Sequence, residues 1–339
     1  MRKLLLPLLA LLTLPMTISA QTPNASPAAP SPAVQIDRGI NLGNFLEAPH
    51  EGDWGQKLQA DDFSIIKQAG FNTVRVPICW SSHVTAQPPY TIDPTFMNRI
   101  DWVVAQAKAN GLQAILDYHN DNALMKDPDT NADRFVAIWQ QIAEHFKDQP
   151  PSILFELLNE PNGKLDALRW NALLTRTLSV IRVDNPDRAV VVGPVSWNSY
   201  EKLPKLMLPD TDRNLIVTFH YYDPFHFTHQ GASWVDGSDA WLGTTWQGTD
   251  GEKEDITEAF DQAAAWGKEN QRPIYLGEFG AFSRSPIEER ACWTAFVART
   301  AEAHGFAWSY WEFSSGFGAY DPKAHQWRAP LLNALLPKR

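Results

Sequence analysis

The sequence is poor in cysteine and in positive charge. Its 339 residues hold two cysteines, Cys79 and Cys292, which excludes a disulfide framework and predicts two buried free thiols. The formal net charge is -10. Because nucleic-acid binders gather Lys and Arg on one face, this charge argues against nucleic acid as a partner. It is compatible with a neutral or cationic partner.

Three motifs of other chemistries are also missing. The segment "GINLGN" lacks the G-x-G-x-x-G spacing of a phosphate-binding loop, and no G-x-S-x-G nucleophile elbow occurs. The same early strand lacks the H-x-H pair of hydrolytic metal barrels. Zinc binding by His119 and His220 is therefore a minor alternative, and neither a metal nor a cofactor is expected.

The N-terminus carries the one long apolar run. Met1, Arg2 and Lys3 precede "LLLPLLALLTLP", and small residues follow at "TISA". This layout predicts a secretory signal peptide over residues 1–20, cleaved after Ala20, because the run is shorter than the roughly 20 residues that span a bilayer. Residues 21–34 are rich in Pro, Ala and Ser and predict a mobile linker. The mature protein is expected to be secreted, without a membrane segment.

From residue 35 to residue 339 the chain repeats a short apolar run, a loop and a segment of helical period. Strands are expected to end in "RGINLG", "NTVRVP", "QAILDYH", "ILFELLN", "AVVVGP", "LIVTFHY", "PIYLGE" and "FAWSYW". Near-continuous apolar strands alternating with helices indicate a parallel sheet with helices outside. Eight such units in one catalytic domain favour the α/β class and a (β/α)8 TIM barrel over an open doubly wound sheet.

Helices are expected over residues 60–69, 94–110, 132–146, 166–183, 255–269 and 286–304. The longest connection, from Tyr221 to about Asp250, follows the sixth strand. Loops of that length are uncommon unless they build a site.

Polar residues gather where the predicted strands end. In a barrel of this type, the carboxyl ends of the strands share one face and form the active site. The strand-end residues are Asn44, Glu47, Arg75, His119, Asn159, Glu160, His220, Tyr222, Glu278 and Trp311. A catalytic constellation at one mouth of the barrel is therefore predicted.

Glu160, at the end of the fourth strand, and Glu278, at the end of the seventh, are carboxylic acids on different sides of the mouth. A retaining glycosidase needs such a pair about 5 Å apart, one acid as nucleophile and one as general acid and then base. Arg75 and Tyr222 are expected to hold Glu278 ionised, whereas the second carboxylate nearby disfavours ionisation of Glu160. Asn159 is expected to donate to a sugar hydroxyl. Glu156 and Glu312 are expected to be structural.

Six segments carry a family resemblance: "LLNEPNG", "YLGEFG", "NTVRVP", "DYHN", "FHYYDP" and "WSYWEF". They resemble glycoside hydrolase family five, in the clan of retaining barrel glycosidases, over nearly the whole chain from residue 36. The resemblance implies Glu160 as acid/base and Glu278 as nucleophile. It also implies active-site positions for Arg75, His119, Asn159, His220, Tyr222 and Trp311.

Two longer segments, "GINLGNFLEAPHEGDWG" and "HYYDPFHFTHQGASWV", resemble bacterial endoglucanases of this family, some of which also cut mannan. The resemblance implies that Asn44, Glu47 and His229 contact sugar. Many such relatives have two consecutive histidines where this chain has His119 and Asn120, a departure that bears on substrate preference.

Thirteen of the fourteen tryptophans divide into two groups by position. Those in predicted helices are expected to pack against the barrel: Trp102, Trp139, Trp170, Trp266 and Trp293. Those near strand ends are candidates to stack on sugar rings: Trp54, Trp80, Trp197, Trp234, Trp241, Trp246, Trp311 and Trp327. About half of this second group is expected to touch substrate, foremost Trp234 and Trp311.

The sequence thus predicts a secreted, monomeric endo-acting β-glycanase that hydrolyses β-1,4-glucan with retention of configuration. Its expected partner is a β-linked polysaccharide or oligosaccharide. A β-1,4-mannanase or xylanase on the same scaffold is the nearest alternative. A transglycosylase and a noncatalytic carbohydrate-binding barrel are more distant ones.

Overall fold

The computed structural model describes residues 36–337. The predicted signal peptide (1–20) and linker (21–34) lie outside the described residues. Within them, none of the helices combines the length and the apolar character needed to cross a membrane.

Eight parallel strands close into a barrel in which each strand pairs with its neighbours in the sequence and β8 pairs with β1. The strands are β1 (Arg38–Asn41), β2 (Thr73–Ile78), β3 (Gln113–Tyr118), β4 (Ile153–Glu156), β5 (Val190–Val192), β6 (Leu215–Tyr221), β7 (Ile274–Phe279) and β8 (Ala307–Tyr310). The predicted (β/α)8 barrel is confirmed.

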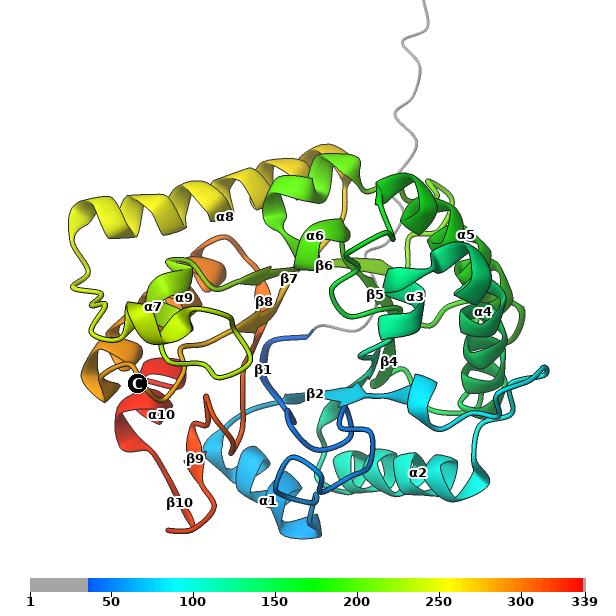
Figure 1. Ribbon diagram of the computed structural model, residues 1–339, viewed down its shortest axis with the longest axis horizontal. Helices are drawn as coiled ribbons and strands as arrows, with labels where there is room; N and C mark the ends of the chain where they lie inside the picture. The colour runs from blue at the N-terminus through cyan, green and yellow to red at the C-terminus, as the bar shows by residue number, and fades with distance from the viewer. Residues whose placement is uncertain (1–35, 338–339) are drawn as a thin grey trace, which may run out of the picture. The chain divides into compact units, whose positions relative to one another are not determined.

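Helices surround the ring of strands, as Figure 1 shows. The longer ones are α1 (Ala60–Ala69), α2 (Pro94–Ala109), α4 (Pro128–His145), α5 (Ala167–Asp184), α8 (Asp250–Asn270), α9 (Ile287–Ala303) and α10 (Ala329–Leu335). Short pieces are η1 (Trp80–Ser82), α3 (Asn122–Lys126), α6 (Val195–Asn198), η2 (Tyr200–Lys205), α7 (Phe225–Thr228) and η3 (Ser238–Trp241). A small hairpin, β9 (Tyr320–Asp321) and β10 (Gln326–Trp327), follows β8.

Two helices begin earlier than predicted because their start signals were not recognised in the sequence. Helix α4 has Pro128 in its first turn, where a missing N–H costs nothing. Helix α8 begins after Thr249, whose side chain accepts a hydrogen bond from the Glu252 N–H while the Glu252 carboxylate accepts one from the Thr249 N–H. This reciprocal capping box fixes the helix start.

The barrel interior is layered by the alternation of strand side chains. At one level an apolar cluster includes Ile115, Leu154, Val191, Ile216 and Tyr275. Two residues further along β3 and β4, the same face carries Asp117 and Glu156, both fully buried. Since residues i and i+2 of a strand share a face, the apolar floor is followed directly by a charged layer.

The prediction of two buried thiols is half wrong. Cys79 is buried at the end of β2, but Cys292 is exposed. Helix α9 turns Trp293 and Val297 toward the barrel, and the residue preceding Trp293 falls on the solvent side of the 3.6-residue period.

Strand β7 contains a β-bulge that decides which way its acid points. Phe219 of β6 pairs with Leu276, but the next residue, His220, pairs with Glu278. The extra residue is Gly277, where an added Cβ would lie 2.5 Å from the Thr218 hydroxyl. The bulge therefore requires glycine, and it turns Glu278 into the barrel beside His220.

Candidate active site

A cavity of about 640 Å³ opens at the carboxyl ends of the strands. It is lined by Asn44, Glu47, Trp54, His119, Asn120, Asn159, Glu160, Tyr222, His229, Ser233, Trp234, Glu278, Trp311, Ser315, Gly316 and Phe317. The structure thus brings all the sequence-predicted site residues together here except Arg75 and His220. Those two are buried, and each contacts a cavity-lining acid.

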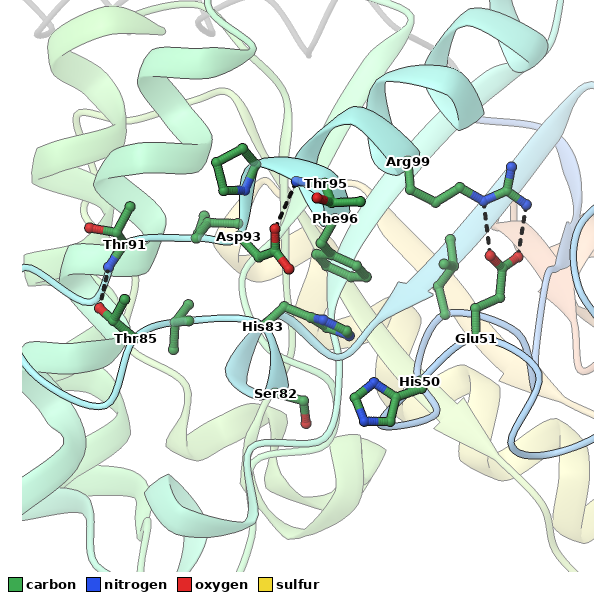
Figure 2. Close-up of a pocket in the computed structure, with 14 residues that line it drawn as sticks. His50, Glu51, Ser82, His83, Thr85, Thr91, Asp93, Thr95, Phe96 and Arg99 are labelled. Atoms are coloured by element: carbon green, nitrogen blue, oxygen red, sulfur yellow. Dashed lines mark hydrogen bonds and ion pairs between the residues drawn. The ribbon is translucent and has the colours of Figure 1, made fainter.

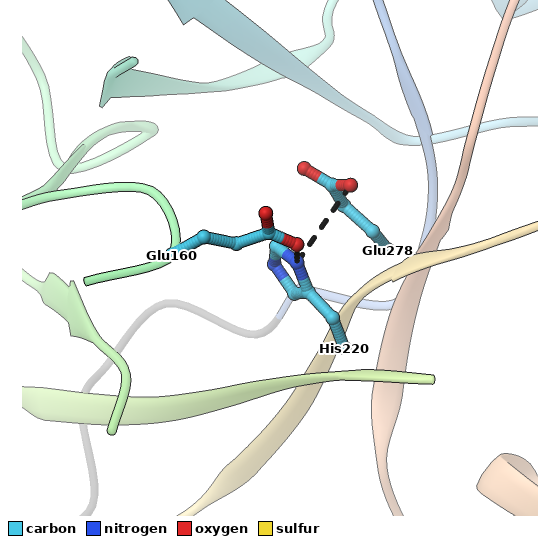
Figure 3. A group of neighbouring side chains, drawn as sticks. All are labelled: Glu160, His220 and Glu278. Carbon is cyan, nitrogen blue, oxygen red and sulfur yellow. Dashed lines mark hydrogen bonds and ion pairs between the residues drawn. The ribbon is translucent and has the colours of Figure 1, made fainter. Parts of the chain in front are cut away.

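The carboxyl groups of Glu160 and Glu278 point toward each other, and the ring of His220 lies beside them (Figure 3). One side-chain atom of each of the three residues lies within 4.8 Å of the other two. His220 Nδ1 is 2.8 Å from Glu160 Oε1 and 3.7 Å from Glu278 Oε2. The two carboxyl groups are therefore close enough to act on the same bond of one substrate.

Both oxygens of Glu278 accept a hydrogen bond. Arg75 Nη1 donates to Oε1 at 2.6 Å, and the Tyr222 hydroxyl donates to Oε2 at 2.9 Å. These are the two contacts that the sequence predicted for this acid. A cation and a hydroxyl donor together stabilise negative charge on the carboxylate, as a nucleophile requires.

Arg75 is the centre of a buried polar network. Besides Glu278, its guanidinium contacts Glu156 at 2.7 and 2.9 Å and Asp117 at 3.0 Å. It also donates to the side-chain oxygens of Asn159 and Asn41, at 2.9 and 3.0 Å. Burial alone would lower the pKa of Arg75, but the carboxylates of Asp117, Glu156 and Glu278 raise it well above its usual value.

The network holds more acid groups than cations. Burial raises the pKa of Asp117 to about 7 against the opposing effect of Arg75, with a further rise from the charge of Glu160. Burial likewise raises the pKa of Glu156, and the charge of Asp117 adds to the rise. Burial beneath the cavity floor thus favours the protonated form of both acids. Glu156 has the structural position that the sequence predicted for it.

Glu160 differs from Glu278 in both backbone and environment. Its φ of 49° lies in the left-handed region, and its carbonyl accepts a hydrogen bond from the Asn162 side chain. Its side chain is 25% exposed. Burial of the carboxyl group raises the pKa of Glu160 to about 7, while His119 and Arg75 act in the opposite direction. Repulsion by Glu278, the predicted cause, is not among these causes: desolvation is the largest, and the charge of Glu156 adds to the rise.

The buried histidines of the site are uncharged at neutral pH. Burial is the main cause that lowers the pKa values of His119, His220 and His229, each to about 4. For His220 the neighbouring Glu278 opposes this shift. His220 is held from its other side, because Asn198 Nδ2 lies 3.2 Å from its Nε2.

His119 is held in one orientation by Asp117. Its Nδ1 lies 2.6 Å from Asp117 Oδ2, the oxygen that also contacts Arg75. A neutral imidazole that donates from Nδ1 leaves an acceptor lone pair at Nε2. Because His119 lines the cavity and stacks with Trp311 at 6.0 Å, it presents a hydrogen-bond acceptor next to an aromatic face.

The remaining predicted residues build the sides of the cavity. Both carboxylate oxygens of Glu47 accept backbone N–H groups, from Asn44 and Phe45, so this acid shapes its own loop. Burial raises the pKa of Glu47 to about 8. His229 and the 59%-exposed Trp234 come from the long connection after β6, which therefore does contribute to the cavity.

Of the eight tryptophans predicted near the active face, three line the cavity: Trp54, Trp234 and Trp311. The prediction is wrong for Trp80 and Trp246, which are buried. Trp327 packs against Phe71 and Tyr320. Trp80 lies on the short helix η1 and Trp327 on the β9–β10 hairpin, and sequence position alone does not reveal that these elements turn the two rings inward.

Sequence reasoning missed several polar residues of the site. Asn41 is fully buried and donates to the carbonyls of Gly277, Ser309 and Tyr310, so it ties β1 to β7 and β8. Asn120, which the sequence marked only as a departure from relatives, has a φ of 58° and donates from Nδ2 to the Glu47 carbonyl. Asp117 was missed although it stands in the quoted segment "DYHN". The signal was available there, because Asp117 and His119 share one strand face.

Within residues 36–337, Glu160, His220 and Glu278 also form the one group of His and acidic side chains whose donor atoms are close enough to bind a metal ion. However, the guanidinium of Arg75 already lies 2.6 Å from Glu278. Its charge would repel a metal ion placed there. The arrangement is better suited to acid, base and nucleophile chemistry.

A family model and two curated relatives match this chain, and all three are described as cellulases or endoglucanases. The family model described as Cellulase (glycosyl hydrolase family 5) matches residues 38–316. Endoglucanase H of Acetivibrio thermocellus is 37% identical over 305 residues, which cover 88% of this chain and 32% of that protein. Cellulase/esterase CelE of the same organism is 30% identical over 308 residues, with 85% and 36% covered. The chain thus spans about a third of the length of these curated relatives.

Solved structures extend the similarity to the fold. Thermotoga maritima Cel5A in complex with mannotriose superposes with a TM-score of 0.87 at 46% identity, covering 89% of this chain and 97% of that one. The same values hold for the Cel5A structure in complex with cellobiose.

The contact between Asp117 and His119 generates a test of the ring orientation. Replacing Asp117 with Ala removes the acceptor, so a large part of His119 should carry its proton on Nε2, as read from the imidazole nitrogen resonances. Asp117→Asn is the matched control: its side-chain oxygen can occupy the Oδ2 position, and it should keep the proton on Nδ1. An unchanged ring in the Ala variant would show that Asp117 does not set the tautomer.

Proposed function

Because this chain belongs to the cellulase family, glycosyl hydrolase family 5, we propose that it is an endo-acting β-1,4-glucanase that retains the configuration of the anomeric carbon. Glu278 is the proposed nucleophile and Glu160 the proposed acid/base. The observation that carries this assignment is the contrast between the two acids. One is paired with Arg75 and Tyr222, whereas burial keeps the other protonated to about pH 7.

In the first step, Glu278 attacks the anomeric carbon while Glu160 protonates the departing glycosidic oxygen. The bond from the anomeric carbon to the leaving sugar breaks as the bond to the Glu278 carboxylate forms. Arg75 and Tyr222 hold the attacking carboxylate in place. Because the carboxylate is already oriented, it does not have to move during the reaction, and this lowers the activation barrier.

In the second step, Glu160 has lost its proton and acts as the base that activates water. Water adds to the anomeric carbon and Glu278 leaves. His220, 2.8 Å from Glu160 Oε1, keeps the carboxyl group in position through both steps. An acid that must both donate and accept a proton works best with a pKa near the working pH, which burial of Glu160 provides.

The spacing of the carboxyl groups supports retention. An inverting enzyme separates its two carboxyl groups by about 6.5 to 9.5 Å to admit a water molecule, whereas a retaining one needs about 5 to 5.5 Å. Oxygens of Glu160 and Glu278 lie within 4.8 Å. This proximity favours the shorter separation of a retaining enzyme.

Glucan is the proposed polymer because the curated relatives are named endoglucanases and a similar structure holds cellobiose. Trp54, Trp234 and Trp311 line the cavity and offer faces for the C–H sides of sugar rings. Asn44, Glu47, His119, Asn159 and His229 are the proposed polar sugar contacts. Mannan is the second candidate, since Cel5A was also solved with mannotriose.

We also propose that the protein is exported and acts as a monomer. The basis for export is the layout of residues 1–20 in the sequence. N-terminal sequencing of the protein recovered outside the cytoplasm should find Gln21 as the first residue. A first residue of Met1 would contradict cleavage, and light scattering of the same sample gives the mass in solution.

Replacing Glu278 with Ala should lower reducing-end release from carboxymethyl cellulose and mixed-linkage β-glucan by at least about 10⁴-fold, because no other group can form the covalent intermediate. Mannan and xylan in parallel assays define the preference. The control is Glu254→Ala, at an exposed acid outside the cavity, which should retain full activity. Near-normal turnover by the Glu278 variant would refute the nucleophile assignment.

The pH dependence tests Glu160. Because burial raises its pKa to about 7, the acid stays protonated, and active, up to about that pH. On a polymer substrate, kcat/KM should fall about tenfold per pH unit above it. An aryl glycoside with a good leaving group needs no proton, so its profile should lack most of this decline. A decline that begins near pH 4.5 would show that burial does not tune Glu160.

A further inference from the structure

A second cavity of about 650 Å³ lies on the same face of the barrel, between the loop after β1 and the loop after β2. The lining residues labelled in Figure 2 include His50 and Glu51 from the first loop and His83 and Asp93 from the second. Phe96 of α2 forms part of its floor. This cavity is as large as the proposed catalytic one and falls within the range of about 300 to 1,000 Å³ typical of ligand sites.

One segment of the chain separates the two cavities. Asn44 and Glu47 line the catalytic cavity, whereas Leu46 and His50 line the second. The segment is held to the ends of β2 and β3, because the Leu46 carbonyl accepts from the Cys79 N–H at 2.9 Å and the Glu47 carbonyl accepts from Asn120. The wall between the cavities is therefore a fixed part of the barrel rim.

The charges of the second cavity disfavour an anion. Glu51 forms a two-bond ion pair with Arg99, at 2.8 and 2.9 Å, so the two charges cancel. Asp93 accepts a hydrogen bond from the Thr95 N–H and forms no ion pair with a side chain of the described region. Its negative charge would repel phosphate or sulfate. The donor atoms of this cavity are also not among those close enough to bind a metal ion.

The remaining chemistry suits a neutral polyhydroxylated ligand. His83 stacks on Phe96 with ring centroids 3.6 Å apart, and His50 meets His83 edge-on at 5.9 Å, which gives a flat surface for C–H groups. Burial lowers the pKa of His83 and so favours its neutral ring, whose Nε2 is buried and has no hydrogen-bond partner among the described residues. Around it, the carboxylate of Asp93 and the exposed threonines Thr91 and Thr95 offer partners for hydroxyl groups.

We propose that this cavity is a second sugar-binding site, which holds a part of the same β-glucan chain that extends beyond the catalytic cavity. The inference rests on the proposed function. Glu160 follows β4 and protonates the leaving part of the chain, so that part departs on the β4 side. In the closed order of eight strands, β8 lies opposite β4 and β1 lies opposite β5. The retained, non-reducing part of the chain can therefore extend over the ends of β8 and β1, and the loop after β1 lines the second cavity.

The site predicts an effect of chain length. His50→Ala removes an exposed ring that no hydrogen bond holds in place, and Asp93→Ser removes the carboxylate while a serine still caps α2. Each variant should lower kcat/KM for the β-1,4-linked glucohexasaccharide by about fivefold, which corresponds to one lost hydrogen bond of about 1 kcal/mol. The combined variant should lose about twentyfold. The trisaccharide, which the catalytic cavity can hold alone, should change less than about twofold.

Asn98→Ala provides the matched control, since Asn98 is exposed on α2 and does not line the cavity. It should leave both substrates unaffected. Equal losses on both chain lengths, or no loss on the hexasaccharide in either variant, would overturn the second site while leaving the proposed function intact. If wild-type protein cuts no β-glucan, the proposed function itself fails and the site assignment fails with it. If the protein cuts mannan faster than glucan, the same comparison of chain lengths is made with the β-1,4-linked mannohexasaccharide and mannotrisaccharide.

Discussion

The site depends on one buried guanidinium. Arg75 contacts Asp117, Glu156 and Glu278 and also two asparagine oxygens, so strands β1, β2, β3, β4 and β7 share a single cation. Breaking a buried ion pair by removing one partner leaves an uncompensated charge and typically costs about 3 to 5 kcal/mol. Such a network contributes little net stability compared with apolar packing. Its effect is to fix the position of one carboxylate and the charge around it.

The second acid is tuned by a different effect. Burial, rather than a charged partner, raises the pKa of Glu160, and its backbone lies in a left-handed conformation that a residue with a Cβ seldom adopts. The bulge at Gly277 turns the facing acid inward. Two local departures from regular backbone, one in each strand end, therefore set the distance between the acids. Departures of this kind gather at functional sites because regular strands alone cannot aim the groups.

The barrel, its strand order and the position of both acids follow from the sequence, because apolar period and strand-end polarity are local signals. The surroundings of the two acids are harder to predict from the sequence. The contacts of Arg75 with Glu278 and of Tyr222 with Glu278 were predicted, but the role of burial at Glu160 was not, since desolvation depends on the packing of many loops. Trp80 and Cys292 were misplaced for a related reason. Each lies next to a strand end or a buried helical residue. A shift of one position along a strand or helix moves a side chain from the core to the solvent side.

The segment from Asn44 to Glu51 forms part of both cavities, yet it carries neither proposed catalytic acid. Residues 45–48 of this segment are buried, but Pro49 and His50 are exposed. Insertions or deletions at this exposed end would alter how much of the proposed polymer substrate the second cavity can hold without moving Glu160 or Glu278. Surface loops tolerate such changes in length at small thermodynamic cost. Selection for a new polymer can therefore act on this loop separately from the reaction, and lineages that share the same two acids can diverge in the polymers they degrade.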